Sequence, residues 1–187
     1  VYKSFKKFHS SNGFDANVSM SLVSASEANG DDFTHDYKVA TTPYIVSQLS
    51  GGARKNLFKV NTRSHGTNVN DDFKIAVADL TTAANVPGSD YGSFALRVLR
   101  NNPGENNDGE VLEEFTNLSF DPDSVNFVPR AIGDRYVTID TEGKLTYNGD
   151  WPNQSVHVYL SDYSSNLEGI ASDLLPQIGR ASCRERV

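Results

Sequence analysis

Short segments of period-two alternation, separated by turn residues, most constrain the fold of this chain. In residues 73–80, Phe73, Ile75 and Val77 alternate with Lys and Ala. Successive side chains of a strand point to opposite faces, so this segment predicts a strand with those three residues and Asp79 on one face. Further strands are predicted at residues 18–22, 44–46, 57–60, 91–99, 111–115, 136–139, 144–147 and 156–160. This pattern predicts a mainly β fold, an antiparallel β-sandwich or barrel with little helix.

Residues 113–136 combine the end of a strand with a turn and a short helix. Residues 121–124 (DPDS) favour a turn, because Pro fixes φ and the Asp and Ser side chains bond nearby backbone groups. We expect Ser124 or Asn126 to cap a short helix within residues 124–133. Gly133 suits the left-handed position that often ends a helix.

The length of 187 residues is enough for one domain with a substantial core, and 37% of the residues are hydrophobic. The chain begins with Val1, without Met, and we expect it to be an internal piece of a longer protein. We expect residues 1–36 to end a preceding outer domain or insertion and residues 37–160 to form a β-rich middle domain. Residues 161–177 are then expected to start the following segment.

The last ten residues, 178–187 (IGRASCRERV), match a frame translation of a common sequencing-library adapter. We therefore expect them not to be native. Cys183, the single cysteine, lies among them, so the sequence gives no basis for a disulfide or a thiol site.

The formal net charge of −7 disfavours nucleic acid or an anionic membrane as a partner, since either requires a basic surface. Lys3, Lys6 and Lys7 form the one basic cluster, with Phe5 and Phe8 between them. Such a cluster is more often a solvated edge than a base-stacking arm. No apolar run approaches the roughly 20 residues that a membrane-spanning helix needs.

The histidines do not form a metal-binding pattern. His9, His35, His65 and His157 lie far apart, and none has the spacing of a helical metal site. Ser64 precedes His65, but neighbouring side chains on an extended chain point in opposite directions, which disfavours a nucleophile–base pair. A hydrolase built on these two residues is the weakest of the functional hypotheses.

Acidic residues occur at Asp31–Asp32, Asp71–Asp72 and Asp121/Asp123, without the ligand spacing of a calcium-binding loop. Asp is favoured in turns, which is the simpler interpretation. A glycosidase carboxylate pair depends on the fold and stays open at this point. The segment 51–56 (GGARKN) lacks the GK[ST] ending of a phosphate-binding loop.

Trp151 follows the turn residues Asn148, Gly149 and Asp150 and precedes Pro152. An aromatic side chain at such a place can stack on a sugar. More often it closes one end of a β core.

Five segments resemble the contractile tail sheath proteins of large myophages, in particular the T4-like group, and the last three lie in the family's order. They are residues 42–48 (TPYIVSQ), 57–77 (LFKVNTRSHGTNVNDDFKIAV), 87–100 (PGSDYGSFALRVLR), 111–136 (VLEEFTNLSFDPDSVNFVPRAIGDRY) and 143–153 (GKLTYNGDWPN). Family members usually carry Pro after the turn Ser and a small residue before the Arg, where this chain has Val125 and Pro129. Because Pro129 lacks an N–H, we expect the helix to begin at Asn126, with Pro129 in its first turn.

The resemblance implies a structural virion protein. Sheath subunits polymerise helically around the inner tail tube and contract after baseplate triggering, which drives genome delivery. The expected partners are other sheath subunits, the tube and the baseplate, and the expected location is the phage tail, assembled in the host cytoplasm. No catalytic, cofactor-binding or metal-binding residue is expected, and the chain is expected not to be an enzyme.

The alternative from another class is a carbohydrate- or receptor-binding β-sandwich module of a tail fibre or secreted protein. It would use Trp151 with Tyr147 or Tyr159. Glycan binding that depends on Trp151 would favour this alternative over a purely structural role.

Overall fold

The structure is a computed structural model that describes residues 39–66, 69–139, 144–167 and 170–181. The chain divides into two compact units, Val1–Asp36 and Tyr37–Val187, and all the described residues belong to the second. The strand predicted at residues 18–22 lies outside the described residues.

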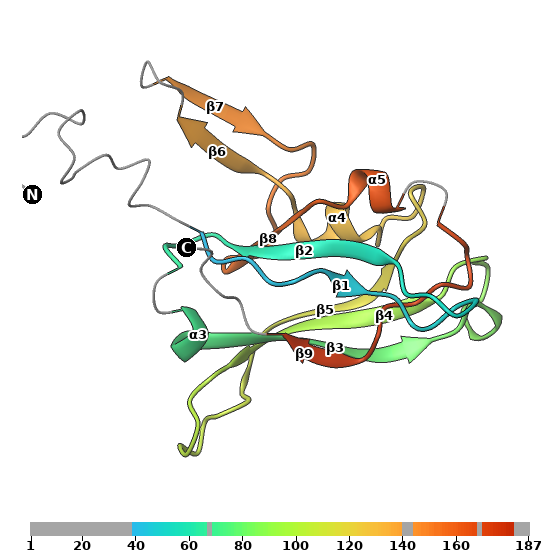
Figure 1. Cartoon of the computed structure of the whole chain (residues 1–187), viewed down its shortest axis with the longest axis horizontal. Helices are drawn as coiled ribbons and strands as arrows, with labels where there is room; N and C mark the ends of the chain where they lie inside the picture. Colours follow the sequence, from blue (N-terminus) through green and yellow to red (C-terminus); the bar gives the residue numbers. More distant parts are fainter. Residues whose placement is uncertain (1–38, 67–68, 140–143, 168–169, 182–187) are drawn as a thin grey trace, which may run out of the picture. The chain divides into compact units, whose positions relative to one another are not determined.

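Within the described ranges the chain forms two larger antiparallel sheets and one hairpin (Figure 1). The three-stranded sheet has the order β1–β2–β8, from Ile45–Val46, Asn56–Thr62 and Val158–Ser161. The four-stranded sheet has the order β5–β4–β3–β9, from Val111–Ser119, Ser93–Arg100, Phe73–Thr81 and Gly179–Ala181. The hairpin joins β6 (Tyr136–Ile139) to β7 (Leu145–Asn148).

Helical segments in the described part are short: α3 (Val69–Asp72), α4 (Val128–Ile132), α5 (Ser164–Leu167) and the 3₁₀ turn η1 (Ala83–Asn85). The predictions of a mainly β fold and of a short helix within residues 124–133 are confirmed.

One hydrophobic core receives side chains from both larger sheets. Phe120, which follows β5, contacts a ring from each sheet: its ring centroid is 6.4 Å from that of Phe58 on β2 and 5.1 Å from that of Phe94 on β4. All three rings are at most 1% exposed. Burial of such apolar area is the main favourable contribution to folding, so Phe120 links the two sheets.

Strand β2 is buried on both faces, but the two faces differ in chemistry. Phe58 and Val60 belong to the core, whereas Lys59 and Asn61 alternate with them and therefore point the other way. Lys59 donates to Asp162 at 2.5 Å, which provides a partner for a charge that is only 8% exposed. The polar face of β2 is therefore covered by other parts of the chain.

The alternation predicted for β3 holds at Phe73, Ile75 and Val77, which are buried, but is wrong at Asp79. Asp79 is exposed, has a φ of +52°, and lies where the pairing with β4 shifts register. An irregularity of this kind reorients the side chains that follow it.

The predicted turn at residues 121–124 is present. The Asp123 N–H donates to the Asp121 side chain at 3.0 Å, and the Ser124 N–H donates to the Asp121 carbonyl at 3.1 Å. Arg130 donates to the carbonyl of Ser124 at 2.7 Å, which joins the turn to α4.

The expected start and cap of α4 are wrong. The helix begins at Val128 rather than Asn126, and Phe127 is the N-cap residue, without a side-chain cap bond. The Ser124 hydroxyl instead accepts from the Asn126 N–H at 3.1 Å and so extends the turn. Gly133 ends the helix with a positive φ of +105°, which favours glycine, but its ψ of 154° lies outside the expected left-handed helical region.

Strands β6 and β7 pair along their full length, from Tyr136 opposite Asn148 to Ile139 opposite Leu145. Val137 is 49% exposed and its partner Tyr147 is 76% exposed. The loop expected at residues 140–143 lies outside the described residues.

The chain continues past residue 160 without leaving this unit. Leu167, Ile170 and Leu174 are buried in the common core. Beyond them β9, which lies within the decapeptide 178–187, pairs with Ile75–Val77 of β3. The backbone at 179–181 therefore has a place at the edge of the four-stranded sheet.

Candidate functional site

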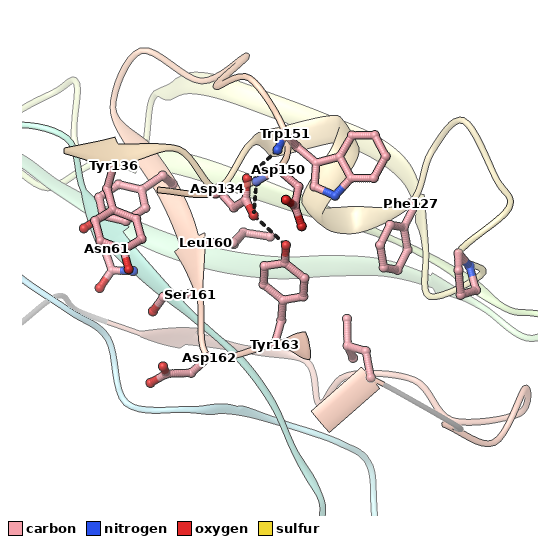
Figure 2. Close-up of a pocket in the computed structure, with 14 residues that line it drawn as sticks. Asn61, Phe127, Asp134, Tyr136, Asp150, Trp151, Leu160, Ser161, Asp162 and Tyr163 are labelled. Carbon is pink, nitrogen blue, oxygen red and sulfur yellow. Dashed lines mark hydrogen bonds between the residues drawn. The ribbon is translucent and has the colours of Figure 1, made fainter. Parts of the chain in front are cut away.

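A cavity of about 690 Å³ is formed where β8 and the polar face of β2 meet the segments after α4 and after β7 (Figure 2). We call it the Asp134 cavity. The residues that line it and matter most are Asn61, Asp134, Tyr136, Asp150, Trp151 and Tyr163. Aromatic walls with a few polar groups are typical of ligand pockets.

Asp134 organises one wall of the cavity. It is 5% exposed, and its carboxylate accepts from the Trp151 N–H at 2.7 Å, the Asp150 N–H at 3.2 Å and the Tyr163 hydroxyl at 2.5 Å (Figure 2). A buried carboxylate needs such partners, because desolvation without them is strongly unfavourable. Asp134 therefore fixes Asp150, Trp151 and Tyr163 around one point.

Gly149 allows the loop after β7 to approach Asp134 closely. A Cβ atom at Gly149 would lie 2.4 Å from the Asp134 carbonyl oxygen, and the φ of Gly149 is +92°. Only glycine tolerates both the close approach and this backbone conformation. The turn predicted at residues 148–150 thus carries Asp150 and Trp151 into the cavity wall.

Tyr163, two residues after the end of β8, lies below Asp134 in Figure 2 and lines the cavity there. Burial raises the pKa of its phenol, and the hydrogen bond to Asp134 and the nearby negative charges raise this pKa further. The phenol therefore stays protonated well above neutral pH and remains a donor to Asp134.

Aromatic side chains form the rest of the wall. Tyr136 stacks on Tyr159 with ring centroids 5.8 Å apart and an interplanar angle of 19°. The half-buried Trp151 faces the guanidinium of Arg130 at 4.5 Å from the ring centroid. Trp151 is half-buried and is not among the residues of the hydrophobic core in the described part of the chain.

Asn61 brings an unsatisfied polar group to the opposite end of the cavity. Its side chain accepts from the Thr41 hydroxyl at 2.7 Å, but its amide nitrogen is buried and has no hydrogen-bond partner among the described residues. The residue is 4% exposed. Buried donors without a partner are rare in folded proteins and require an explanation.

The charges around the cavity are acidic. Asp134, Asp150 and Asp162 line it, whereas Lys, Arg and His are absent from its described lining. Lys59, which does not line the cavity, pairs with Asp162, and its Nζ lies 4.3 Å from the ring centroid of Tyr44. An anionic ligand would therefore meet repulsion here.

A second cavity, of about 520 Å³, lies across the Tyr136–Tyr159 stack and is lined by Arg63, Arg135 and Tyr147 as well. Three aromatic residues were considered for sugar binding. Trp151 lines the Asp134 cavity, Tyr147 lines the second cavity, and Tyr159 lines both.

The other candidates from the sequence are dispersed, except for three that line one further cavity. Ser64 lines a third cavity, of about 480 Å³, with Asp72 and His157, and His65 is not part of this lining. His157 packs 5.6 Å from the Phe73 ring, and its Nε2 is 4.0 Å from Glu113. Asp121 and Asp123 serve the turn described above.

The remaining candidates, Lys3, Lys6, Lys7, His9, His35, Asp31, Asp32 and Cys183, lie outside the described residues, as does the Asp71 side chain. Among the residues that the structure does describe, no three His, Cys, Asp or Glu side chains gather as metal ligands would. No described helix is long and apolar enough to span a membrane.

Sequence reasoning found Trp151 and Tyr159 but missed Asn61, Asp134 and Tyr163. Asn61 carried no signal, since it directly follows the strand predicted at residues 57–60. Asp134 carried none, because its role arises from contacts with residues 16 to 29 positions away.

In comparisons with known proteins, no family model matches this chain, and no curated protein or solved structure matches it.

Proposed function

We propose that this chain is part of a contractile tail sheath subunit of a T4-like myophage, with the described unit as a β-sandwich middle domain. The observation that carries the proposal is the resemblance of residues 111–136, the longest run of the series. This run comprises β5, the turn, α4 and the start of β6. It therefore joins the four-stranded sheet to the hairpin.

The contacts of this run suit a module that moves as one body during contraction. The Ser119 N–H donates to the Asn126 carbonyl at 2.9 Å, so the chain pairs with itself across the turn. Phe120 packs into both sheets at the same point. Close-packed interiors transmit displacement with little compression. A domain built this way would transmit force between neighbouring subunits without deforming.

The proposed partners are other sheath subunits, the inner tail tube and the baseplate, in a virion tail assembled in the host cytoplasm. The net charge of −7 supports protein partners over nucleic acid or an anionic membrane. The proposed role is mechanical and requires no enzymatic step.

The test is assembly. The same locus, read beyond both ends of this sequence, is expressed beside the 187-residue chain, and both products are examined by negative-stain electron microscopy and sedimentation. We expect tubes from the extended product and monomers from the chain alone. An extended product that carries no further sheath-like sequence and stays monomeric would contradict the proposal.

A recognition module is the second candidate, and one observation favours it: Trp151 and Tyr159 line the same cavity. The two candidates differ in their readout. A sheath subunit forms tubes whether or not the Asp134 cavity is filled, whereas a recognition module binds a ligand whether or not it assembles.

A further inference from the structure

We propose that the Asp134 cavity is a binding site for a neutral polyhydroxylated ligand, with one saccharide unit seated between Trp151 and Asn61. The inference deepens the recognition candidate, and it does not rest on sheath assembly. Its support comes from the aromatic wall, the unsatisfied amide and the charge of the cavity.

The aromatic wall provides apolar surface for the ligand. Trp151 is half-buried and Tyr136 is 41% exposed, so neither residue is fully enclosed by the chain. A pyranose ring has an apolar face of C–H groups that packs against an aromatic ring, and its hydroxyls lie at the edge. A volume of about 690 Å³ lies within the range of roughly 300–1,000 Å³ that is common for ligand pockets.

The Asn61 amide suits a hydroxyl group. Its nitrogen is a buried donor without a partner among the described residues, and a ligand acceptor that reaches it would supply the missing bond. A half-turn of the amide exchanges its oxygen and nitrogen. The Thr41 hydroxyl fits either orientation, because it can donate or accept. The ligand would then need a donor at the same point. A hydroxyl meets both requirements, whereas an ammonium or guanidinium group cannot accept.

The carboxylates favour the same ligand and exclude its charged relatives. Asp150 and Asp162 are exposed at the cavity and can accept from ligand hydroxyls. Both would repel a phosphate, a sulfate or an acidic sugar. A basic peptide would also satisfy the carboxylates, and its backbone carbonyls could accept from Asn61, so it is the competing ligand in the test below. The charge of the cavity itself favours a neutral sugar over an anionic ligand.

The experiment uses the whole 187-residue chain. A panel of neutral sugars, namely glucose, galactose, mannose and N-acetylglucosamine with their β-linked and α-linked dimers, is titrated by calorimetry and by NMR of the tryptophan indole. We expect saturable binding of at least one sugar, with a shift of the single indole signal, Trp151 being the only tryptophan.

Three variants locate the site. Trp151→Ala and Asn61→Leu should each weaken binding by at least about tenfold, the range expected for a lost stacking face or a ligand hydrogen bond. Tyr147→Ala removes an aromatic ring that does not line the Asp134 cavity, and it should leave the affinity unchanged. Thermal unfolding of each variant verifies that it is folded at the titration temperature.

Four outcomes would overturn the inference: no neutral sugar binds and the cavity holds water only, the affinity survives both Trp151→Ala and Asn61→Leu, it depends on Tyr147 instead, or a Lys- and Arg-rich peptide binds while sugars do not. None of these bears on tube formation, so failure of the sugar site and failure of the sheath proposal are separate results.

Discussion

The two faces of β2 are equally buried but serve different purposes. On one face Phe58 and Val60 enter the core. On the other, Asn61 lines the Asp134 cavity and Lys59 pairs with Asp162 of its lining, and the Asn61 amide nitrogen has no partner among the described residues. Residues on both faces are buried. Burial of apolar side chains on the first face stabilises the fold, whereas burial of a donor without a partner on the second is unfavourable. The comparison indicates that stability resides on the core face, while the polar face retains an unfavourable group that the proposed sugar site would use.

The largest predicted effect tests the core face. Phe58→Ala should lower the free energy of unfolding by about 3–5 kcal/mol, because it leaves a cavity next to Phe120 where the two sheets meet. Urea unfolding followed by tryptophan fluorescence measures this loss. Leu49→Ala is the control, since Leu49 is 66% exposed and its loss should change the stability by less than about 0.5 kcal/mol. Equal effects of the two substitutions would refute the assignment of the core.

The next prediction concerns the backbone that holds the polar face in place. Gly149→Ala should destabilise the protein by at least about 2 kcal/mol, since the new Cβ meets the Asp134 carbonyl oxygen and the φ of +92° is strained for alanine. Gly104→Ala is a matched control, because Gly104 has the same φ of +92° and no atom within 4 Å of the added Cβ. The difference in unfolding free energy between the two variants isolates the close approach. If it is zero, the loop does not pack on Asp134.

A smaller effect depends on pH. The folded pKa of Tyr163 lies above its ordinary value of 10.0, so the folded state holds the phenolic proton more tightly than the unfolded chain does. Its stabilising contribution is then complete below pH 10 and is lost as the pH rises further. Tyr163→Phe should lose about 1 kcal/mol at neutral pH, discounted for the partial exposure of the side chain.

Above pH 10 the wild-type protein should lose stability faster than Tyr163→Phe does. We would measure the unfolding free energies of both proteins between neutral pH and pH 11. Subtracting one curve from the other cancels the titration of the other tyrosines, which both proteins share. Parallel curves would mean that the hydrogen bond to Asp134 does not form in solution.

The sequence predicted the strands well and the site poorly, for physical reasons. Alternation at Phe73, Ile75 and Val77 reports the burial of one face directly, and turn residues 121–124 act through bonds between near neighbours. The Asp134 cavity instead depends on contacts across the fold, such as the one from Tyr163 to Asp134. The predicted start of α4 was wrong because the Ser124 hydroxyl could accept either as a helix cap or within the turn. In the structure it accepts from the Asn126 N–H, within the turn.

The smallest predicted effect on stability gives the most direct test of the comparison between the two faces of β2. Asn61→Leu removes an unsatisfied amide together with its one bond to Thr41, a residue exposed enough for water to replace that bond. The two changes oppose each other, so the free energy of unfolding should stay within about 1 kcal/mol of wild type or rise.

The matched control is the next residue of the same strand. Thr62 is fully buried, and its hydroxyl accepts from the Ala40 N–H at 3.0 Å and donates to the Ser64 carbonyl at 2.9 Å. Thr62→Val keeps the shape but leaves the buried Ala40 N–H without this acceptor, so it should cost about 1–3 kcal/mol. If Asn61→Leu is the more damaging of the two in urea unfolding, Asn61 is a structural residue. If it is neutral while sugar binding is lost, the amide is retained for the ligand, because a group that adds no stability and is buried without a partner has no other evident use in this fold.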